Sequence, residues 1–305
     1  MNKNRLGKSD IYLSDLTLGC MSLGASPNKA SEIIDEALDA GINHLDTADL
    51  YDFGMNEEIV GEAIKSKRKD IILTTKVGNH FDRAKKDWYW DPSKSHIKQG
   101  LKDSLRRLQT DYLDFYMLHG GTIDDPIEET ISAFDELKQE GVIRAYGISS
   151  IRPNVIHEYV QRSSIDGVMM QYNMLDRRPE EEILDLLERH TISVLARGPL
   201  AKGTLTEKGN QQIEKKAQDG FLDYSHEELI QIYRELSNKV DDSQLSSIAF
   251  NYVLHHPAVA SAVFGASSIN QVKNNVAFNT GRPMTDELYA SLQAITKPIK
   301  FDKHR

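Results

Sequence analysis

The sequence predicts an α/β protein of the (β/α)₈ TIM-barrel class, with a small β-hairpin ahead of the barrel. Eight strand-like apolar runs alternate with segments of helical spacing, and repeated strand–helix–strand connections give a parallel sheet covered by helices. The eight units occupy about 250 residues, the usual size of a closed barrel. An open dinucleotide-binding sheet would carry G-x-G-x-x-G after its first strand, and residues 19–24 read Gly-Cys-Met-Ser-Leu-Gly instead.

The hairpin is expected where Arg5–Leu6 and Ile11–Leu13 flank a turn of Gly, Lys, Ser and Asp. The eight expected strands are short and mostly apolar, at Leu16–Met21, Ile42–Asp46, Ile71–Val77, Leu113–His119, Val142–Ile148, Gly167–Gln171, Ile192–Ala196 and Val259–Phe264. The expected helices repeat apolar residues three and four positions apart, at Lys29–Ala40, Glu57–Ile64, Ser95–Leu108, Ile127–Gln139, Asn154–Gln161, Glu180–His190, His226–Lys239, Gln244–His255, Ile269–Phe278 and Asp286–Thr296. Residues 204–225 form a long polar insertion, and residues 1–305 are expected to make one domain.

Composition narrows the classes of function. The net charge of −9 is spread along the chain, which argues against nucleic acid or an anionic membrane surface as the partner. One cysteine allows no intramolecular disulfide, and the N-terminus lacks the apolar stretch of a secretory signal. No apolar run is long enough for membrane insertion. We therefore expect a cytoplasmic protein; its oligomeric state does not follow from the sequence.

Four polar residues follow the ends of three neighbouring strands. Asp46 ends the second strand and Tyr51 lies in its loop, Lys76 is near the end of the third, and His119 ends the fourth. In a barrel the chemistry is carried at the carboxyl ends of the strands. Each residue alone has an ordinary structural explanation, since a strand-end lysine is usually a solvated charge. Together they predict an active site at one rim.

These residue types suit carbonyl reduction. A free tyrosine has a pKa of about 10, and a nearby ammonium such as that of Lys76 favours its phenolate. Asp46 can pair with Lys76 and hold it in place. His119 can donate a hydrogen bond to a substrate carbonyl. Protonating a carbonyl oxygen as negative charge develops on it is the requirement for reducing an aldehyde or ketone, and the hydride must come from a cofactor.

Ordered motifs extend through nearly the whole chain. They are Arg5-Leu6-Gly7, Leu45-Asp46-Thr47-Ala48, Tyr51 to Glu57, Thr74-Thr75-Lys76, Leu118-His119, Gly147-Ile148-Ser149, Gln171-Tyr172-Asn173, Gly198-Pro199-Leu200, and Gly265-Ala266-Ser267 with Gln271 and Asn275. With this set the sequence resembles the aldo-keto reductases, in the branch related to potassium channel β-subunits and bacterial aldehyde reductases. The resemblance implies a barrel that binds extended NADP(H), and a tetrad of Asp46, Tyr51, Lys76 and His119 with Tyr51 as proton donor.

The resemblance also implies positions that bind the cofactor. Those near the nicotinamide are Gly19, Cys20, Met21, Ser149, Ser150, Gln171 and Arg197. Those at the pyrophosphate and the adenosine are Gly198, Pro199, Leu200, Lys202, Gly203, Gly265, Ser267, Ser268, Gln271, Asn274 and Asn275.

Three of these positions depart from the family pattern. The usual amide-binding glutamine is Met169 here, and Gln171, which faces the same way in a strand, is the expected substitute. Arg197 stands where an aromatic ring usually stacks on the nicotinamide, and a planar guanidinium can also stack on a ring. Ser267 and Gln271 stand where charged residues often hold the 2′-phosphate. The helix that begins at Ile269 offers its N-terminus to that phosphate, and for this reason NADP is expected over NAD.

Two other groups of residues have less specific interpretations. The loop from Asn79 to Trp90 contains Phe81, Trp88 and Tyr89, which could form a substrate wall or simply anchor the loop. No metal site is expected at His255-His256, because no third ligand stands at a suitable spacing.

Two functions from different classes are compatible with these residues. The first is an NADP(H)-dependent reductase of small aldehydes or ketones. The second is a cofactor-binding regulatory subunit of a membrane protein, because the resemblance extends to channel β-subunits. The intact tetrad favours the enzyme.

Overall fold

The barrel is closed by eight parallel strands. The computed structural model describes residues 1–240, 244–277 and 284–305. Around the barrel the strand order is β10-β11-β12-β3-β4-β5-β8-β9. The strands are β3 (Leu16–Gly19), β4 (His44–Asp46), β5 (Ile72–Val77), β8 (Leu113–Leu118), β9 (Ile143–Ser149), β10 (Gly167–Gln171), β11 (Ser193–Arg197) and β12 (Val259–Gly265). The predicted (β/α)₈ fold class is confirmed.

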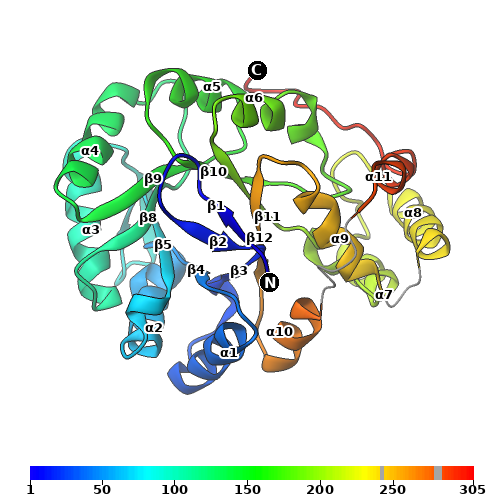
Figure 1. The fold of residues 1–305 in the computed structure, drawn as a ribbon, viewed down its shortest axis with the longest axis horizontal. Helices are drawn as coiled ribbons and strands as arrows, with labels where there is room; N and C mark the ends of the chain where they lie inside the picture. The colour runs from blue at the N-terminus through cyan, green and yellow to red at the C-terminus, as the bar shows by residue number, and fades with distance from the viewer. Residues whose placement is uncertain (241–243, 278–283) are drawn as a thin grey trace.

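Helices form a ring around this barrel (Figure 1). They are α1 (Pro27–Asp39), α2 (Met55–Ile64), α3 (Lys94–Leu108), α4 (Ile127–Gln139), α5 (Pro153–Arg162), α6 (Ile183–Arg189), α7 (Gly209–Lys216), α8 (His226–Lys239), α9 (Leu245–Leu254), α10 (Ile269–Val276) and α11 (Asp286–Gln293). Side-chain caps mark several of their starts; Ser225, for example, makes a capping box with Glu228. Within the described residues, no helix is long and apolar enough to cross a membrane.

The N-terminal hairpin of β1 (Lys3–Arg5) and β2 (Tyr12–Ser14) packs against the barrel interior. It is antiparallel and lies across the barrel mouth in the view of Figure 1. Its turn residues Leu6 and Ile11 are buried in one cluster with Phe115, Met117 and Leu195 from the strands. The hairpin therefore fills one end of the barrel with apolar side chains. The polar residues of the predicted active site lie toward the other end. The predicted hairpin is confirmed.

Two segments contain structure that the sequence did not reveal. The polar insertion holds α7, and the aromatic loop is a second hairpin of β6 (Asn79–Asp82) and β7 (Asp87–Trp90). Both segments are rich in charge and largely exposed, so they lack the apolar periodicity that sequence patterns detect.

Elsewhere the observed ends of helices and strands differ from the predicted ends by a few residues. The helix predicted from Glu180 was wrong at its start, because a 3₁₀ turn (Arg178–Glu181) precedes α6. Glu180 instead turns inward, where it accepts hydrogen bonds from the hydroxyls of Tyr252 (2.5 Å) and Tyr172 (3.0 Å). The predicted end of the α10 helix at Phe278 lies outside the described residues.

The close packing of β9 on β10 gives a test of the barrel. A Cβ added to Gly147 would lie 2.0 Å from the backbone oxygen of Gly167. We expect Gly147→Ala to lower the free energy of unfolding by about 2–3 kcal/mol or more, as overpacking does. Gly141, which has φ +75° and open space around its Cβ position, is the control; its alanine variant should lose about 1–2 kcal/mol from backbone strain alone.

Urea denaturation followed by circular dichroism would measure both variants. An equal loss for the two would contradict the close-packing argument for Gly147.

Candidate active site

Lys76 is the centre of the predicted tetrad. It is fully buried near the end of β5, and its Nζ lies 2.9 Å from Oδ2 and 2.8 Å from Oδ1 of Asp46 at the end of β4. The same ammonium donates to the backbone oxygen of Thr47 at 2.7 Å and reaches the hydroxyl of Tyr51 at 3.4 Å. The structure thus brings three of the four predicted residues into contact through one positive charge.

The environment shifts both charged partners. Burial lowers the pKa of Lys76, but the Asp46 carboxylate and Tyr51 outweigh it, so this pKa lies above its usual value. Burial raises the pKa of Asp46, and the Lys76 ammonium opposes that rise. A buried charge without a partner is costly. Each of the two charges is therefore held in its ionised form chiefly by the other.

His119 completes the group from the end of β8. Its ring stands edge-on to that of Tyr51, with centroids 5.8 Å apart. Its pKa is lowered to about 3 by burial and by the positive charges of Lys76 and Arg197. Its Nδ1 is buried and has no hydrogen-bond partner among the described residues. The imidazole is therefore neutral at physiological pH, with one N–H that can act as a donor.

A polar layer beneath the tetrad was missed at the level of sequence. His44, two residues before Asp46, has Nδ1 2.7 Å from the Thr17 hydroxyl and Nε2 2.7 Å from the Thr74 hydroxyl. Thr17 also lies 2.6 Å from the hydroxyl of Ser261. Alternation along each strand places these side chains inside the barrel, one step below the rim. The signal in the sequence was a polar residue two positions before Asp46 and before Lys76, in strands that otherwise read as apolar.

A second buried group lies behind the tetrad. Glu57 of α2 is fully buried and accepts hydrogen bonds from Arg107 (2.6 Å) and the Thr75 hydroxyl (2.5 Å). Asp49 is also buried, and its Oδ1 lacks a hydrogen-bond partner among the described residues. Burial and the nearby Glu57 raise the pKa of Asp49 well above its usual value, although Arg107 opposes them.

Several predicted nicotinamide positions share the rim with the tetrad. Gly19 pairs in register with Asp46, Met169 with Ser149, and Gln171 with Arg197. Met169 is buried in the barrel interior. Gln171 follows it by two residues and therefore faces the same interior at the rim. The substitution of Gln171 for the usual amide-binding glutamine stays a prediction.

The predicted pyrophosphate and adenosine positions surround one cavity. Its volume is about 840 Å³, and it runs between the β11 end, the polar insertion and α10. Its lining includes most of the predicted residues of that part, namely Gly198, Pro199, Leu200, Lys202, Gly203, Gly265, Ser267, Gln271, Asn274 and Asn275. The cavity also contains Lys208 and Lys216, which the sequence did not single out.

Three of the predicted nicotinamide positions differ in their burial and hydrogen bonding. The Cys20 side chain is buried, and its backbone oxygen accepts from the Asn56 amide at 2.8 Å. Met21 is 63% exposed. Ser150 is buried, and its hydroxyl accepts from the Arg152 backbone at 3.2 Å. The part of these three residues in binding a cofactor stays a prediction.

The aromatic hairpin lies beside the rim. The Trp90 ring fills the space where a Cβ on Gly78 would fall, at 2.6 Å, and reaches Gly120, the residue after His119. Its indole N–H donates to Asp125 at 3.0 Å. Trp88 and Tyr89 are exposed by 52% and 57%. Trp90 is therefore an anchor, whereas Trp88 and Tyr89 are only partly covered.

The expectation about His256 needs a correction. The structure places the carboxylates of Asp185 and Glu188, from α6, within reach of His256, so further candidate ligands do exist. They come from a distant part of the sequence, which spacing could not show. Both carboxylates are exposed, and His256 already lies 3.2 Å from Asp185. We base no metal site on this exposed group.

Comparisons with known proteins agree with this geometry. A family model described as the aldo/keto reductase family matches residues 15–297. The chain is 55% identical to the "uncharacterized oxidoreductase YqkF" of Bacillus subtilis over 100% of both chains. It is 31% identical to the "NADH-specific methylglyoxal reductase" of Escherichia coli, over 91% of this chain and 93% of that one. A solved structure, the holo form of aldo-keto reductase AKR11C1 from Bacillus halodurans, has a TM-score of 0.93 at 53% identity, covering 100% and 99% of the two chains.

The buried Asp49 gives a prediction for stability against pH. Because its pKa is raised in the folded state, the folded protein holds its proton where the unfolded chain, with a pKa of about 3.9, has released it. Stability is therefore lost as pH rises above about 4 and through the raised pKa. We expect Asp49→Asn to be more stable than the parent at neutral pH, with the difference shrinking toward acid pH.

Denaturation curves between pH 4 and 8 would test this, with the exposed Asp52→Asn variant as the baseline. If Asp49→Asn is less stable at pH 7 than both the parent and Asp52→Asn, the buried carboxylate is ionised and contributes to stability.

Proposed function

We propose that this chain, which belongs to the aldo/keto reductase family, reduces aldehyde or ketone carbonyls to alcohols with NADP(H), and that Tyr51 donates the proton. The observation that carries the proposal is the contact of Lys76 with both Asp46 and Tyr51 at the rim of the barrel. A buried ammonium 3.4 Å from a phenol is unusual for a purely structural site. The Lys76 ammonium suits a phenol, here that of Tyr51, which must give up a proton and then carry negative charge.

Each residue of the tetrad has a separate role in this proposal. Tyr51 would transfer its hydroxyl proton to the carbonyl oxygen as negative charge develops there. Lys76 would stabilise the phenolate that remains, and Asp46 would hold Lys76 in position. His119 would donate its N–H to the same oxygen and orient it. A nicotinamide dinucleotide, when bound, supplies the hydride.

The cavity beside the rim fits an extended dinucleotide. It continues from Gly198, which follows the end of β11, toward the N-terminus of α10. Lys202, Lys208 and Lys216 bring positive charge to it, which suits an anionic ligand. At its far end Gln271 accepts, through Oε1, hydrogen bonds from the backbone N–H (2.7 Å) and the hydroxyl (3.1 Å) of Ser267. We propose that this end receives the 2′-phosphate of NADP(H).

Replacing the proton donor tests the reaction. We expect Tyr51→Phe to lower kcat/KM by about 10²–10⁴-fold, the usual contribution of a positioned acid, while NADPH still binds. The assay is NADPH oxidation with a panel of small aldehydes and ketones. NADPH affinity by fluorescence titration is the control, because Phe retains the aromatic packing on His119.

The outcomes separate the two classes of function. Turnover in the parent that survives in Tyr51→Phe would contradict the assigned proton donor. Tight NADPH binding without turnover of any carbonyl in the parent would instead support the regulatory alternative.

The nucleotide preference has its own test. Placing a negative charge near the proposed 2′-phosphate, with Gln271→Glu, should weaken NADPH binding by roughly tenfold or more through repulsion. NADH lacks this phosphate, so its affinity should change much less. The isosteric change keeps the acceptor for Ser267. Equal weakening of both nucleotides, or tighter NADH than NADPH binding in the parent, would contradict the proposed NADP(H) preference.

A further inference from the structure

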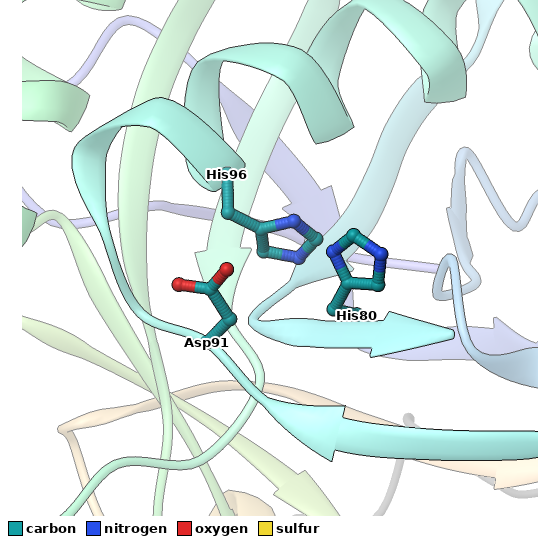
Figure 2. A group of neighbouring side chains, drawn as sticks. All are labelled: His80, Asp91 and His96. Atoms are coloured by element: carbon teal, nitrogen blue, oxygen red, sulfur yellow. The ribbon is translucent and has the colours of Figure 1, made fainter. Parts of the chain in front are cut away.

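A second group of potential ligands lies at the base of the aromatic hairpin. His80 of β6, Asp91 after the end of β7, and His96 in the first turn of α3 each offer one ligand atom, and these atoms lie within 4.8 Å of one another. Figure 2 shows the two imidazole rings close together, with the Asp91 carboxylate beside His96. His80 lies in a strand, Asp91 in a connecting segment and His96 in a helix, so their sequence spacing does not reveal the group.

We propose that His80, Asp91 and His96 bind a divalent transition-metal ion of the Zn²⁺ type. Imidazole nitrogen and carboxylate oxygen are ordinary ligands of such ions, and three protein ligands leave a position for water. In a tetrahedral site with bonds of about 2.0–2.1 Å the ligand atoms would stand roughly 3.3 Å apart. Ordinary side-chain rotation covers the difference from the observed spacing.

The hydrogen bonds around the group leave its ligand atoms available. Nε2 of His96 is buried and has no hydrogen-bond partner among the described residues. Oδ1 of Asp91 accepts from the Ser93 backbone at 3.0 Å, which leaves lone pairs on the carboxylate for a cation. The ring of His80 stacks on that of Tyr89, with centroids 4.7 Å apart. The stacking and the Ser93 contact keep these two ligands close to the group.

An ion at this position would connect the hairpin to the body of the barrel. His96 belongs to α3, whereas His80 lies in the paired strand β6 and Asp91 directly follows β7. Asp91 directly follows Trp90, which packs over Gly78 and Gly120 at the barrel rim. Metal binding would therefore hold the hairpin and its tryptophan against the rim, independently of any nucleotide. The inference stands whether or not the proposed reductase activity is correct.

Zinc titration of the chelator-treated full chain, without nucleotide, tests the site. We expect one tightly bound Zn²⁺ per chain by calorimetry. His96→Gln and Asp91→Asn should each weaken it by more than about tenfold, which is the lower limit for losing even an indirect contact to a metal. Asp91→Asn keeps an acceptor for the Ser93 backbone, so it separates metal binding from the local turn. His157→Gln, outside both ligand groups, is the matched control and should bind as the parent does.

A second readout follows the hairpin itself. Zn²⁺ should slow amide hydrogen exchange over residues 79–91 in the parent and in His157→Gln, but not in His96→Gln. Thermal melting would confirm that each variant is folded. The proposal is overturned if the parent binds no zinc, if His96→Gln and Asp91→Asn bind it as tightly as the parent, or if binding is lost in His256→Gln instead.

Discussion

The buried ion pair between Lys76 and Asp46 is the constraint on which the rest of the site depends. Two opposite charges buried inside a barrel are stable only if they pair with each other and their remaining hydrogen-bonding groups also have partners. The closed sheet meets that condition by pairing β4 with β5, so that Asp46 stands opposite Thr74, two residues before Lys76. The backbone oxygen of Thr47 accepts a further hydrogen bond from the ammonium. Tyr51 lies in the loop that leaves the same strand, and its hydroxyl reaches the same ammonium at 3.4 Å.

The sequence predicted the parts of the fold that have a strong period and the parts of the site that lie at strand ends. Strands such as β10 and helices such as α4 and α8 agree with the predicted ranges, because apolar burial determines both pattern and structure there. The β6–β7 hairpin and α7 were not predictable in the same way, since their charged and exposed residues make local pairings with little burial. The group of His80, Asp91 and His96 depends on that hairpin, so sequence patterns did not predict it either.

Protonation states are a second property that the sequence could not provide. His44 and His119 are ordinary histidines by type, yet the pKa of each is lowered to about 3, in both cases by burial first and then by Lys76. The carboxyl of Asp49 has its pKa raised by burial and by Glu57. These shifts arise from distances across strands and helices rather than from neighbours along the chain. Burial and the positive charge of Lys76 together keep both imidazoles neutral, and the same charge opposes the rise in the pKa of Asp46.

Arg197 is a second positive charge at the rim, at the position where the resemblance to the family implies an aromatic ring. Its positive charge opposes the rise that burial causes in the pKa of Asp46 and adds to the lowering of the pKa of His119, although its own side chain is exposed at the rim. An aromatic ring at this position would exert neither effect. In the proposed reaction a second cation at the rim would favour the developing negative charge on the carbonyl oxygen, and it would also attract the phosphates of a dinucleotide toward the adjoining cavity. The substitution therefore need not weaken the site, because the charge acts in the same direction as Lys76.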